Sequence, residues 1–244
     1  MPHPLMYVLG DTEKHQFPLI LVVGREPNYD DELDDSIGII NKEHFKSMSG
    51  GVWVTAYTQV AKQCFGPTAR AWQLKALCLD KNASPIAFTN AFPVAIPNAM
   101  ANKAVLRSKV INRIPTHISG IFDNPVARRY ALVIQHGADK TEASSVACAA
   151  IARECKKRDI PYFSTPFFYN GNSVHIQSCL REAAPIMQSI LADFVAAAPN
   201  QLGYLGVFQG SCRLFHSRGS FFQPLRTLRI EGGRTDHTPV ARLA

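Results

Sequence analysis

Residues that can do chemistry follow the first of several short apolar runs in the chain. The run over residues 17–23 ends in Gly24-Arg25-Glu26-Pro27. Glycine permits a tight turn and proline fixes the direction in which the chain leaves, so both would hold Glu26 at the end of the run. The carboxylate of Glu26 is thus a candidate catalytic group. The alternative is a structural ion pair with Arg25 or with a helix terminus.

Two further apolar runs also end in polar residues. The strand expected in the run over residues 85–92 ends in Thr89-Asn90, before Pro93 closes the run, and His136-Gly137 closes the run over residues 130–135. The Asn90 amide offers one donor group and one acceptor, the pattern that reads the edge of a nucleobase. His136 is a candidate proton donor. Structural roles in a turn or a loop are the alternatives for both side chains.

The fourth apolar run, over residues 160–164, leads into a segment that can bind a flat ligand. Residues 165–173 supply hydroxyl groups, amides and aromatic faces. Phe167 and its neighbours can stack on a base or on an unpaired strand. The alternative is that these aromatic residues belong to the hydrophobic core.

The four apolar runs are typical of buried strands, and the segments between them are helical in pattern. Strands that alternate with helices predict a parallel sheet covered by helices on both faces, a three-layer α/β/α domain with four strands. Ligands of such domains bind beyond the carboxyl ends of the strands, where the polar residues lie. Helices are expected over residues 52–64, 69–79, 101–114, 141–158 and 174–198.

Proline residues define two of these boundaries. The helix over residues 101–114 is expected to end before Pro115, because the residue that precedes a proline disfavours helical geometry. Pro185 is expected to kink or split the helical segment over residues 174–198.

Composition and charge narrow the class of protein. The 244 residues are 46% hydrophobic and 18% charged, which excludes a disordered or fibrous chain. No stretch is long and apolar enough to cross a membrane, and no export signal begins the chain, so a cytoplasmic protein is expected.

The net charge is +7, and residues 210–244 contain six arginines but only two acidic residues. A single domain over residues 1–205 with a basic extension over residues 206–244 is therefore expected, and the basic arm suits contact with phosphate groups.

The six cysteines do not predict a metal site. No two of them are spaced as Cys-x-x-Cys, and no compact group of cysteine and histidine suggests zinc. We expect reduced, buried thiols, and neither a metal nor another cofactor. Residues 30–35 include five acids, which form either a solvated loop or a site for a divalent cation.

Taken together, these motifs resemble the uracil-DNA glycosylase superfamily, of which the chain looks like a divergent member. The resemblance rests on a strand that ends in Gly-x-x-Pro at Gly24, a strand that ends in Thr89-Asn90, and a late strand that leads into Thr165-Pro166. It implies a four-stranded parallel sheet between helices and hydrolysis of the bond between a base and deoxyribose. Such an enzyme flips the base out of the stack and holds it by edge contacts and stacking.

The resemblance assigns roles residue by residue. Glu26 stands where some members have a catalytic aspartate, and Asn90 stands near the asparagine that reads the base. Thr165 replaces the histidine of the family's second motif, which makes His136 the candidate donor to the leaving base. The other candidates for base or substrate binding are Gly24, Pro27, Tyr29, Thr89, Thr165, Phe167 and Asn170, and those for the nucleic-acid backbone are Arg25, Arg213 and Arg218.

Three functions follow from this reading. The first is a DNA glycosylase-like hydrolase that acts on single- or double-stranded DNA. The second is a non-catalytic protein of the same fold that binds nucleic acid or nucleotide, which the missing motif histidine favours. The third is an enzyme that acts on a free nucleoside, for which the acidic residues 30–35 are no handicap.

Overall fold

The computed structural model describes seven segments of the chain, all within one compact unit that spans Met1–Gln201. The described residues are 6–10, 17–25, 39–47, 51–93, 103–137, 142–168 and 172–197. The basic extension over residues 206–244 lies outside them.

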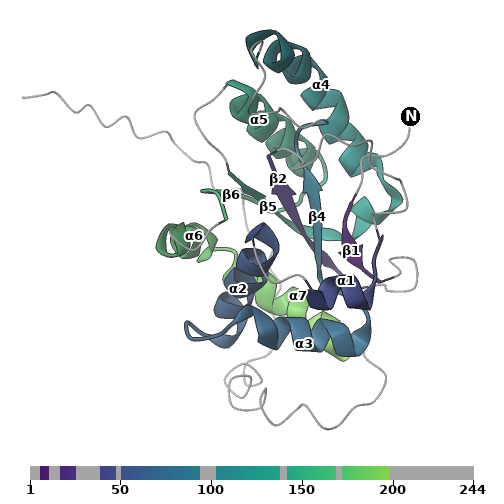
Figure 1. Cartoon of the computed structure of the whole chain (residues 1–244), viewed down its shortest axis with the longest axis vertical. Helices are drawn as coiled ribbons and strands as arrows, with labels where there is room; N and C mark the ends of the chain where they lie inside the picture. Colours follow the sequence, from purple (N-terminus) through teal and green to yellow (C-terminus); the bar gives the residue numbers. More distant parts are fainter. Residues whose placement is uncertain are drawn as a thin grey trace, which may run out of the picture. The chain divides into compact units, whose positions relative to one another are not determined.

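A four-stranded parallel sheet forms the centre of the unit (Figure 1). Its strands are β2 (Leu19–Gly24), β4 (Ile86–Asn90), β5 (Tyr130–His136) and β6 (Tyr162–Thr165), in the order β4-β2-β5-β6. All six residues of β2 are buried, as expected for a strand covered on both faces. The four strands predicted from the apolar runs are confirmed.

Two short strands accompany this sheet. The strands β1 (Val8–Leu9) and β3 (Ile39–Ile40) pair in parallel, and Tyr7 forms an isolated antiparallel bridge with Phe88 of β4. The sequence did not predict them, because two residues carry too short a pattern to recognise.

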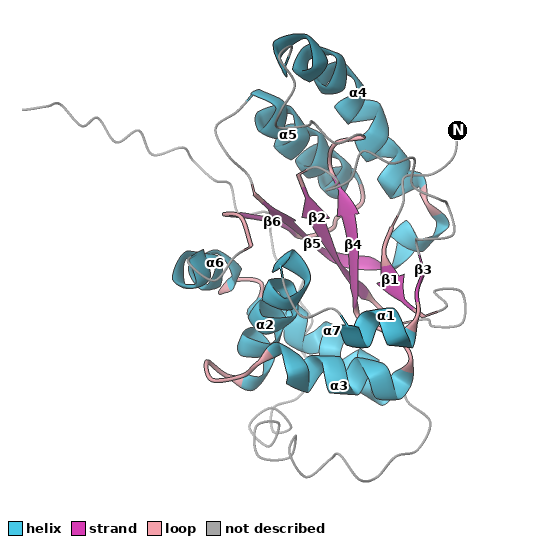
Figure 2. Ribbon diagram, in the orientation of Figure 1, coloured by secondary structure: helices cyan, strands magenta, loops and turns pink. Residues whose placement is uncertain are grey.

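Helices cover both faces of the sheet, which confirms the three-layer arrangement (Figure 2). One layer contains α4 (Lys103–Asp123) and α5 (Glu142–Lys157), joined by an ion pair of 3.1 Å between Arg158 and Asp123. A short 3-10 helix, η2 (Pro125–Arg129), follows α4. The other layer contains α1 (Lys42–Ser47), α2 (Gly51–Phe65), α3 (Ala71–Lys81), α6 (Ser173–Leu180) and α7 (Ala184–Ala196).

The predicted end of one helix before Pro115 is wrong, because α4 continues through the proline to Asp123. The apolar period also continues, since Ile114, Ile118 and Ile121 are all buried. Burial of this stripe outweighs the hydrogen bond that proline removes from the helix.

The predicted interruption at Pro185 is confirmed. The segment forms two helices, α6 and α7, and Pro185 lies in the first turn of α7, where its missing N–H costs nothing.

Within the described residues, no helix combines the length and apolar character needed to cross a membrane.

Candidate functional site

Four predicted site residues form one row across the carboxyl edge of the sheet. Gly24 is paired in register with Asn90, and His136 is paired with Thr165. The register of β2 with β5 pairs Val23 with Gln135, so Gly24 and His136 are the next pair along. Registered residues of parallel strands share a face, so the order of the row is Asn90, Gly24, His136, Thr165. The expectation that these strand ends meet is confirmed.

The row crosses the point between β2 and β5 where the chain changes the side on which it adds the next strand. After β2 the chain passes through α1, α2 and α3 to β4 on one side of β2, whereas after β5 it passes through α5 to β6 on the other side. The two connections lie on opposite faces (Figure 1). Chain segments that diverge in this way leave a crevice at the carboxyl ends of adjacent strands, the usual ligand site in open parallel sheets. Here the diverging ends are Gly24 and His136.

Gly24 keeps two polar side chains close to one point. A Cβ atom on Gly24 would lie 2.8 Å from Asn90 Oδ1 and 3.2 Å from His136 Nε2. A carbon atom does not fit at the first of these distances, so only glycine leaves the amide and the imidazole where they are. The backbone of Gly24 is an ordinary strand. The presence of glycine at this position is therefore explained by the approach of these two side chains and not by a turn.

His136 is a buried, neutral imidazole. Its ring stacks on Phe168, with centroids 4.8 Å apart and an interplanar angle of 16°, and Phe167 contacts it edge-on. Burial lowers the pKa of His136 to about 4. Its Nδ1 is buried and has no hydrogen-bond partner among the described residues. At neutral pH the ring is thus an uncharged hydrogen-bonding group.

Asn90 is held by its main chain. The Nε2 atom of His117, from α4, lies 2.9 Å from the carbonyl oxygen of Asn90 and donates to it, since a carbonyl can only accept. Beyond the strand, the N–H groups of Ala91 and Phe92 donate to the carbonyl oxygens of Gly24 and Arg25, each at 2.8 Å. These bonds fix the backbone that carries the Asn90 amide. Burial lowers the pKa of His117, against the effect of its bond to Asn90.

Thr165 is in the row but does not offer a free donor. Its side chain is buried, and its hydroxyl lies 3.1 Å from the carbonyl oxygen of Pro166 and 3.5 Å from that of Gln135. The single hydroxyl hydrogen is directed to the main chain.

Thr89 is not part of the row. It is registered with Val23, one position before Gly24, and successive side chains of a strand point to opposite faces. Thr89 is buried on the face away from Asn90. The expectation that Thr89 contacts a ligand together with Asn90 therefore needs correction, for this reason of strand geometry.

Phe167 and Arg25 lie at the rim of the site. Half of the Phe167 side chain is exposed, and Arg25 is exposed. Both are close to Gly137, where a Cβ atom would lie 3.2 Å from Phe167 Cδ2 and 4.0 Å from Arg25 Cβ. Gly137 has a φ of +76°, which disfavours any other residue. The structure thus places Phe167, a candidate for stacking on a base, and Arg25, a candidate for the nucleic-acid backbone, beside the same glycine.

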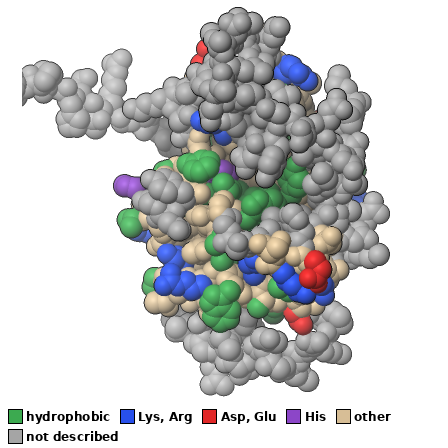
Figure 3. Space-filling view, viewed as in Figure 1, with side chains coloured by type: hydrophobic (Ala, Val, Ile, Leu, Met, Phe, Trp, Pro, Cys, Tyr) green, Lys and Arg blue, Asp and Glu red, His purple; other side chains and the backbone are tan. Residues whose placement is uncertain are grey.

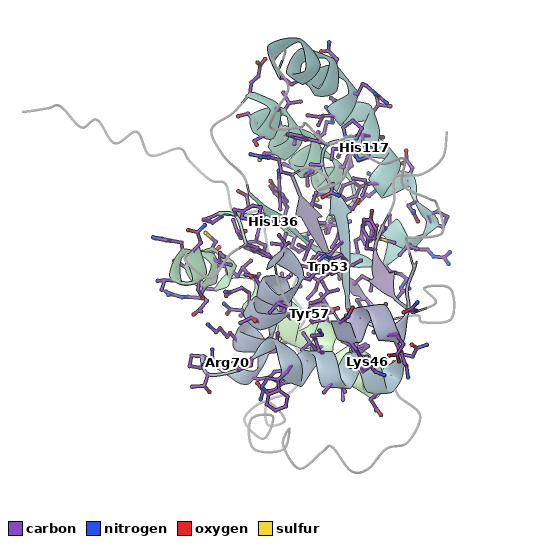
Figure 4. The ribbon with its side chains drawn as sticks, in the orientation of Figure 1. Lys46, Trp53, Tyr57, Arg70, His117 and His136 are labelled. Atoms are coloured by element: carbon purple, nitrogen blue, oxygen red, sulfur yellow. The ribbon has the colours of Figure 1, made fainter. Side chains whose placement is uncertain are left out.

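Sequence reasoning missed two residues beside the row, Trp53 and His117. Trp53 of α2 packs on Phe88, with ring centroids 3.9 Å apart, and Phe88 lies two residues before Asn90 on the same face of the sheet. In Figure 4 Trp53 lies on the α2 side of the sheet and His117 on the α4 side. Neither residue follows a strand, so the search at strand ends could not find them.

Several predicted site residues lie outside the described part of the chain. They are Glu26, Pro27, Tyr29, Asn170, Arg213 and Arg218, together with the acidic residues 30–35.

The described residues contain no group of three histidine, cysteine or acidic side chains that could hold a metal ion. Cys78 and Cys155 are buried thiols, and burial raises the pKa of each to about 12. Cys179 is exposed, so the expectation of a buried thiol is wrong for this residue. Comparisons with models of protein families, with curated proteins and with solved structures found no match for the chain.

Proposed function

We propose that the chain is a DNA glycosylase-like hydrolase, a divergent member of the uracil-DNA glycosylase superfamily, that cleaves the N-glycosidic bond of a flipped base. The observation that carries the proposal is the close approach of the Asn90 amide and the His136 imidazole at Gly24, where the strand order changes direction. A planar ring with polar edges is the ligand that these groups suit.

In this proposal each polar side chain has a separate task. The Asn90 amide reads the edge of the base through one donor and one acceptor. His136, in the tautomer with hydrogen on Nε2, donates to the base as negative charge develops on it. A neutral donor that is already oriented in a site without water stabilises that charge through its hydrogen bond. Phe168 covers the imidazole and keeps water from it.

Glu26 supplies the catalytic carboxylate in the same proposal. It follows Gly24, the last residue of β2, by two positions in the sequence. The carboxylate positions a water molecule and stabilises the positive charge that forms on the sugar. Phe167 and Arg25 at the rim suit the neighbouring part of a nucleic-acid strand, and DNA is the proposed partner.

A second candidate, a binding protein without hydrolytic activity, is favoured by one observation. The hydroxyl of Thr165 is directed to the main chain, at the position where the family has a histidine. A site with one donor fewer holds a base but stabilises its departure less.

An assay for base release separates the candidates. The protein is incubated with single- and double-stranded DNA that contains uracil, hypoxanthine or a mismatch, and abasic sites are measured. We expect release by the wild type and by Thr89→Ser, whose side chain lies on the other face, and loss of release in Glu26→Gln and Asn90→Ala. Salt-sensitive binding of DNA without abasic sites supports the second candidate. Release of base from free nucleosides alone overturns DNA as the substrate.

A further inference from the structure

The outer surface of α3 carries an exposed indole. Trp72 is 68% exposed, and within the described residues the other large apolar side chains that are exposed are Phe167 and Val174. The inward face of α3, which includes Leu74 and Cys78, is already buried in the core. The packing of α3 therefore does not use the ring of Trp72, whose surface is accessible to a partner.

The neighbours of Trp72 on the helix surface leave the ring accessible. Ala76 follows it by four residues, which makes the two side chains neighbours on the helix, and Ala76 is small and exposed. The Cα–Cβ bond of a helical residue tilts toward the amino end of the helix, so the indole leans toward the turn over residues 66–70 that joins α2 to α3. Arg70 of this turn is also exposed, and Figure 4 shows it beyond the end of α2 that is remote from Trp53. An aromatic ring and a guanidinium group thus share one part of the surface.

The surface around Trp72 is basic. The helices α1, α2 and α3, with the turn between α2 and α3, carry six Lys or Arg side chains and two acidic ones. Of the two acids, Glu43 is paired with Lys46 at 2.7 Å, and Asp80 lies eight residues beyond Trp72, about 12 Å along the helix. On the face shown in Figure 3, Lys and Arg side chains lie around α2 and α3. The charge of this surface therefore complements an acidic partner.

The small size of the apolar surface favours a nucleic acid over an acidic protein. A stable protein interface buries about 800 Å² on each partner, several times the area of one indole. Trp72 is the one exposed large apolar side chain of α3, all of which lies in the described part of the chain. A single ring face is enough for one unpaired base, and proteins bind unpaired strands by combining such stacking with positive charge along the phosphates.

We propose that Trp72 stacks on an unpaired base of a single-stranded nucleic acid, whose phosphates contact Arg70 and the basic surface of α1, α2 and α3. This contact is separate from the candidate site at the sheet. Trp53, near the start of α2, packs beside the row, whereas Trp72 follows the other end of α2, about 20 Å away along that helix. The affinity of Trp72 for an unpaired strand does not rest on the proposed function.

Titration of the full chain into a labelled oligodeoxythymidine of about twelve nucleotides, followed by fluorescence anisotropy, tests the contact. We expect binding by the wild type and an affinity lower by about tenfold in Trp72→Ala, because the stacking of one base is lost. Trp72→Phe should keep most of the affinity, since a phenyl ring still offers a face. Val174→Ala, which shortens an exposed apolar side chain of α6, is the matched control and should bind as the wild type does. Equal affinity in Trp72→Ala and the wild type, or no binding by the wild type, overturns the proposal.

The intrinsic fluorescence of the protein tests the stacking directly. The chain contains two tryptophans, Trp53 and Trp72, and stacking on a base quenches an indole. Unlabelled oligodeoxythymidine should quench the wild type, and most of this quenching should be absent from Trp72→Phe, although that variant still binds. Basic residues elsewhere in the chain can attract the strand but cannot produce this difference. The same quenching in both proteins overturns the proposal.

The salt dependence of binding tests the role of Arg70. Arg70→Gln should reduce the slope of log affinity against log salt concentration by about one, because one phosphate contact is lost. Lys156→Gln on α5 is the matched control and should keep the wild-type slope. An unchanged slope in Arg70→Gln overturns its assignment to the phosphates.

Competitors and sedimentation identify the occupant of this surface. A duplex of the same length and polyglutamate should both compete with the labelled strand more weakly than unlabelled oligodeoxythymidine does. Equal competition by either one overturns the stacking, as does a dimer of the wild type that dissociates in Trp72→Ala. Base release with a DNA affinity that Trp72→Ala leaves unchanged contradicts only this inference, and binding through Trp72 without base release contradicts only the proposed function.

Discussion

The substitution Gly24→Ala adds one methyl group at the point on which the candidate site depends. The new Cβ would lie 2.8 Å from Asn90 Oδ1 and 3.2 Å from His136 Nε2. Carbon and its neighbours prefer separations of about 3.5 Å, so the amide must move by several tenths of an ångström. The amide is at the end of a side chain and can move, whereas His136 is held by its stack on Phe168.

The effects on stability and on ligand binding should differ in size. Alanine suits a strand better than glycine by up to about 1 kcal/mol, which offsets the new contact, so the free energy of unfolding should change by less than about 1 kcal/mol. Under the proposed function, the displaced amide loses two hydrogen bonds to the base, each worth about 1 kcal/mol. The resulting loss of about 2 kcal/mol lowers base binding and base release roughly 30-fold.

Three proteins provide the measurement: Gly24→Ala, Asn90→Ala and the double variant. Urea denaturation gives stability, and base release from single-stranded DNA gives function. If the methyl group acts by moving the amide, it should have little further effect once Asn90 is alanine. Wild-type activity in Gly24→Ala would refute the reasoning, as would full additivity of the two substitutions.

Four other substitutions test neighbouring parts of the structure. His136 is neutral in the folded protein, with a pKa of about 4, whereas in the unfolded chain it takes up a proton near pH 6.5. The wild type should therefore lose about 2 kcal/mol of unfolding free energy between neutral pH and pH 5, relative to His136→Phe. The same change of unfolding free energy in both proteins, measured by urea denaturation at the two pH values, would contradict this. His117→Leu removes the donor to Asn90 and should slow base release about tenfold, and His117→Gln should restore most of it; equal rates in the two variants would exclude a positioning role for His117. Pro115→Ala supplies the N–H that α4 lacks and should raise the free energy of unfolding by about 1–2 kcal/mol in urea denaturation, so a decrease would show that the proline is favourable there.

The part of the site made by strand ends could be predicted from the sequence. Continuous apolar runs identified the four strands, and parallel strands place their carboxyl ends at one edge. This reasoning brought Gly24, Asn90, His136 and Thr165 together before their positions were known. It required only local patterns and a general rule of fold geometry.

The remaining features depend on contacts between distant segments. His117 lies beyond Pro115, where the sequence predicted no helix, and its partner is a main-chain carbonyl that no sequence pattern marks. Thr89 and Asn90 are adjacent and both polar, and only the register shows which of them is paired with Gly24. Trp53 of α2 packs on Phe88 of β4, a contact between distant segments that an amphipathic pattern does not specify.

The order of the strands also has a consequence for folding. Each pairing that builds the row joins segments widely separated in the chain, from β2 to β4, from β2 to β5 and from β5 to β6. The connecting segments lose conformational entropy when these loops close, before the strand pairings contribute any stability. This entropic cost slows the formation of parallel sheets. Helices such as α5 can form early without creating any part of the crevice. A refolding chain should therefore regain its helical circular dichroism before it regains the base affinity proposed above, and that affinity should serve as a late marker of the completed sheet.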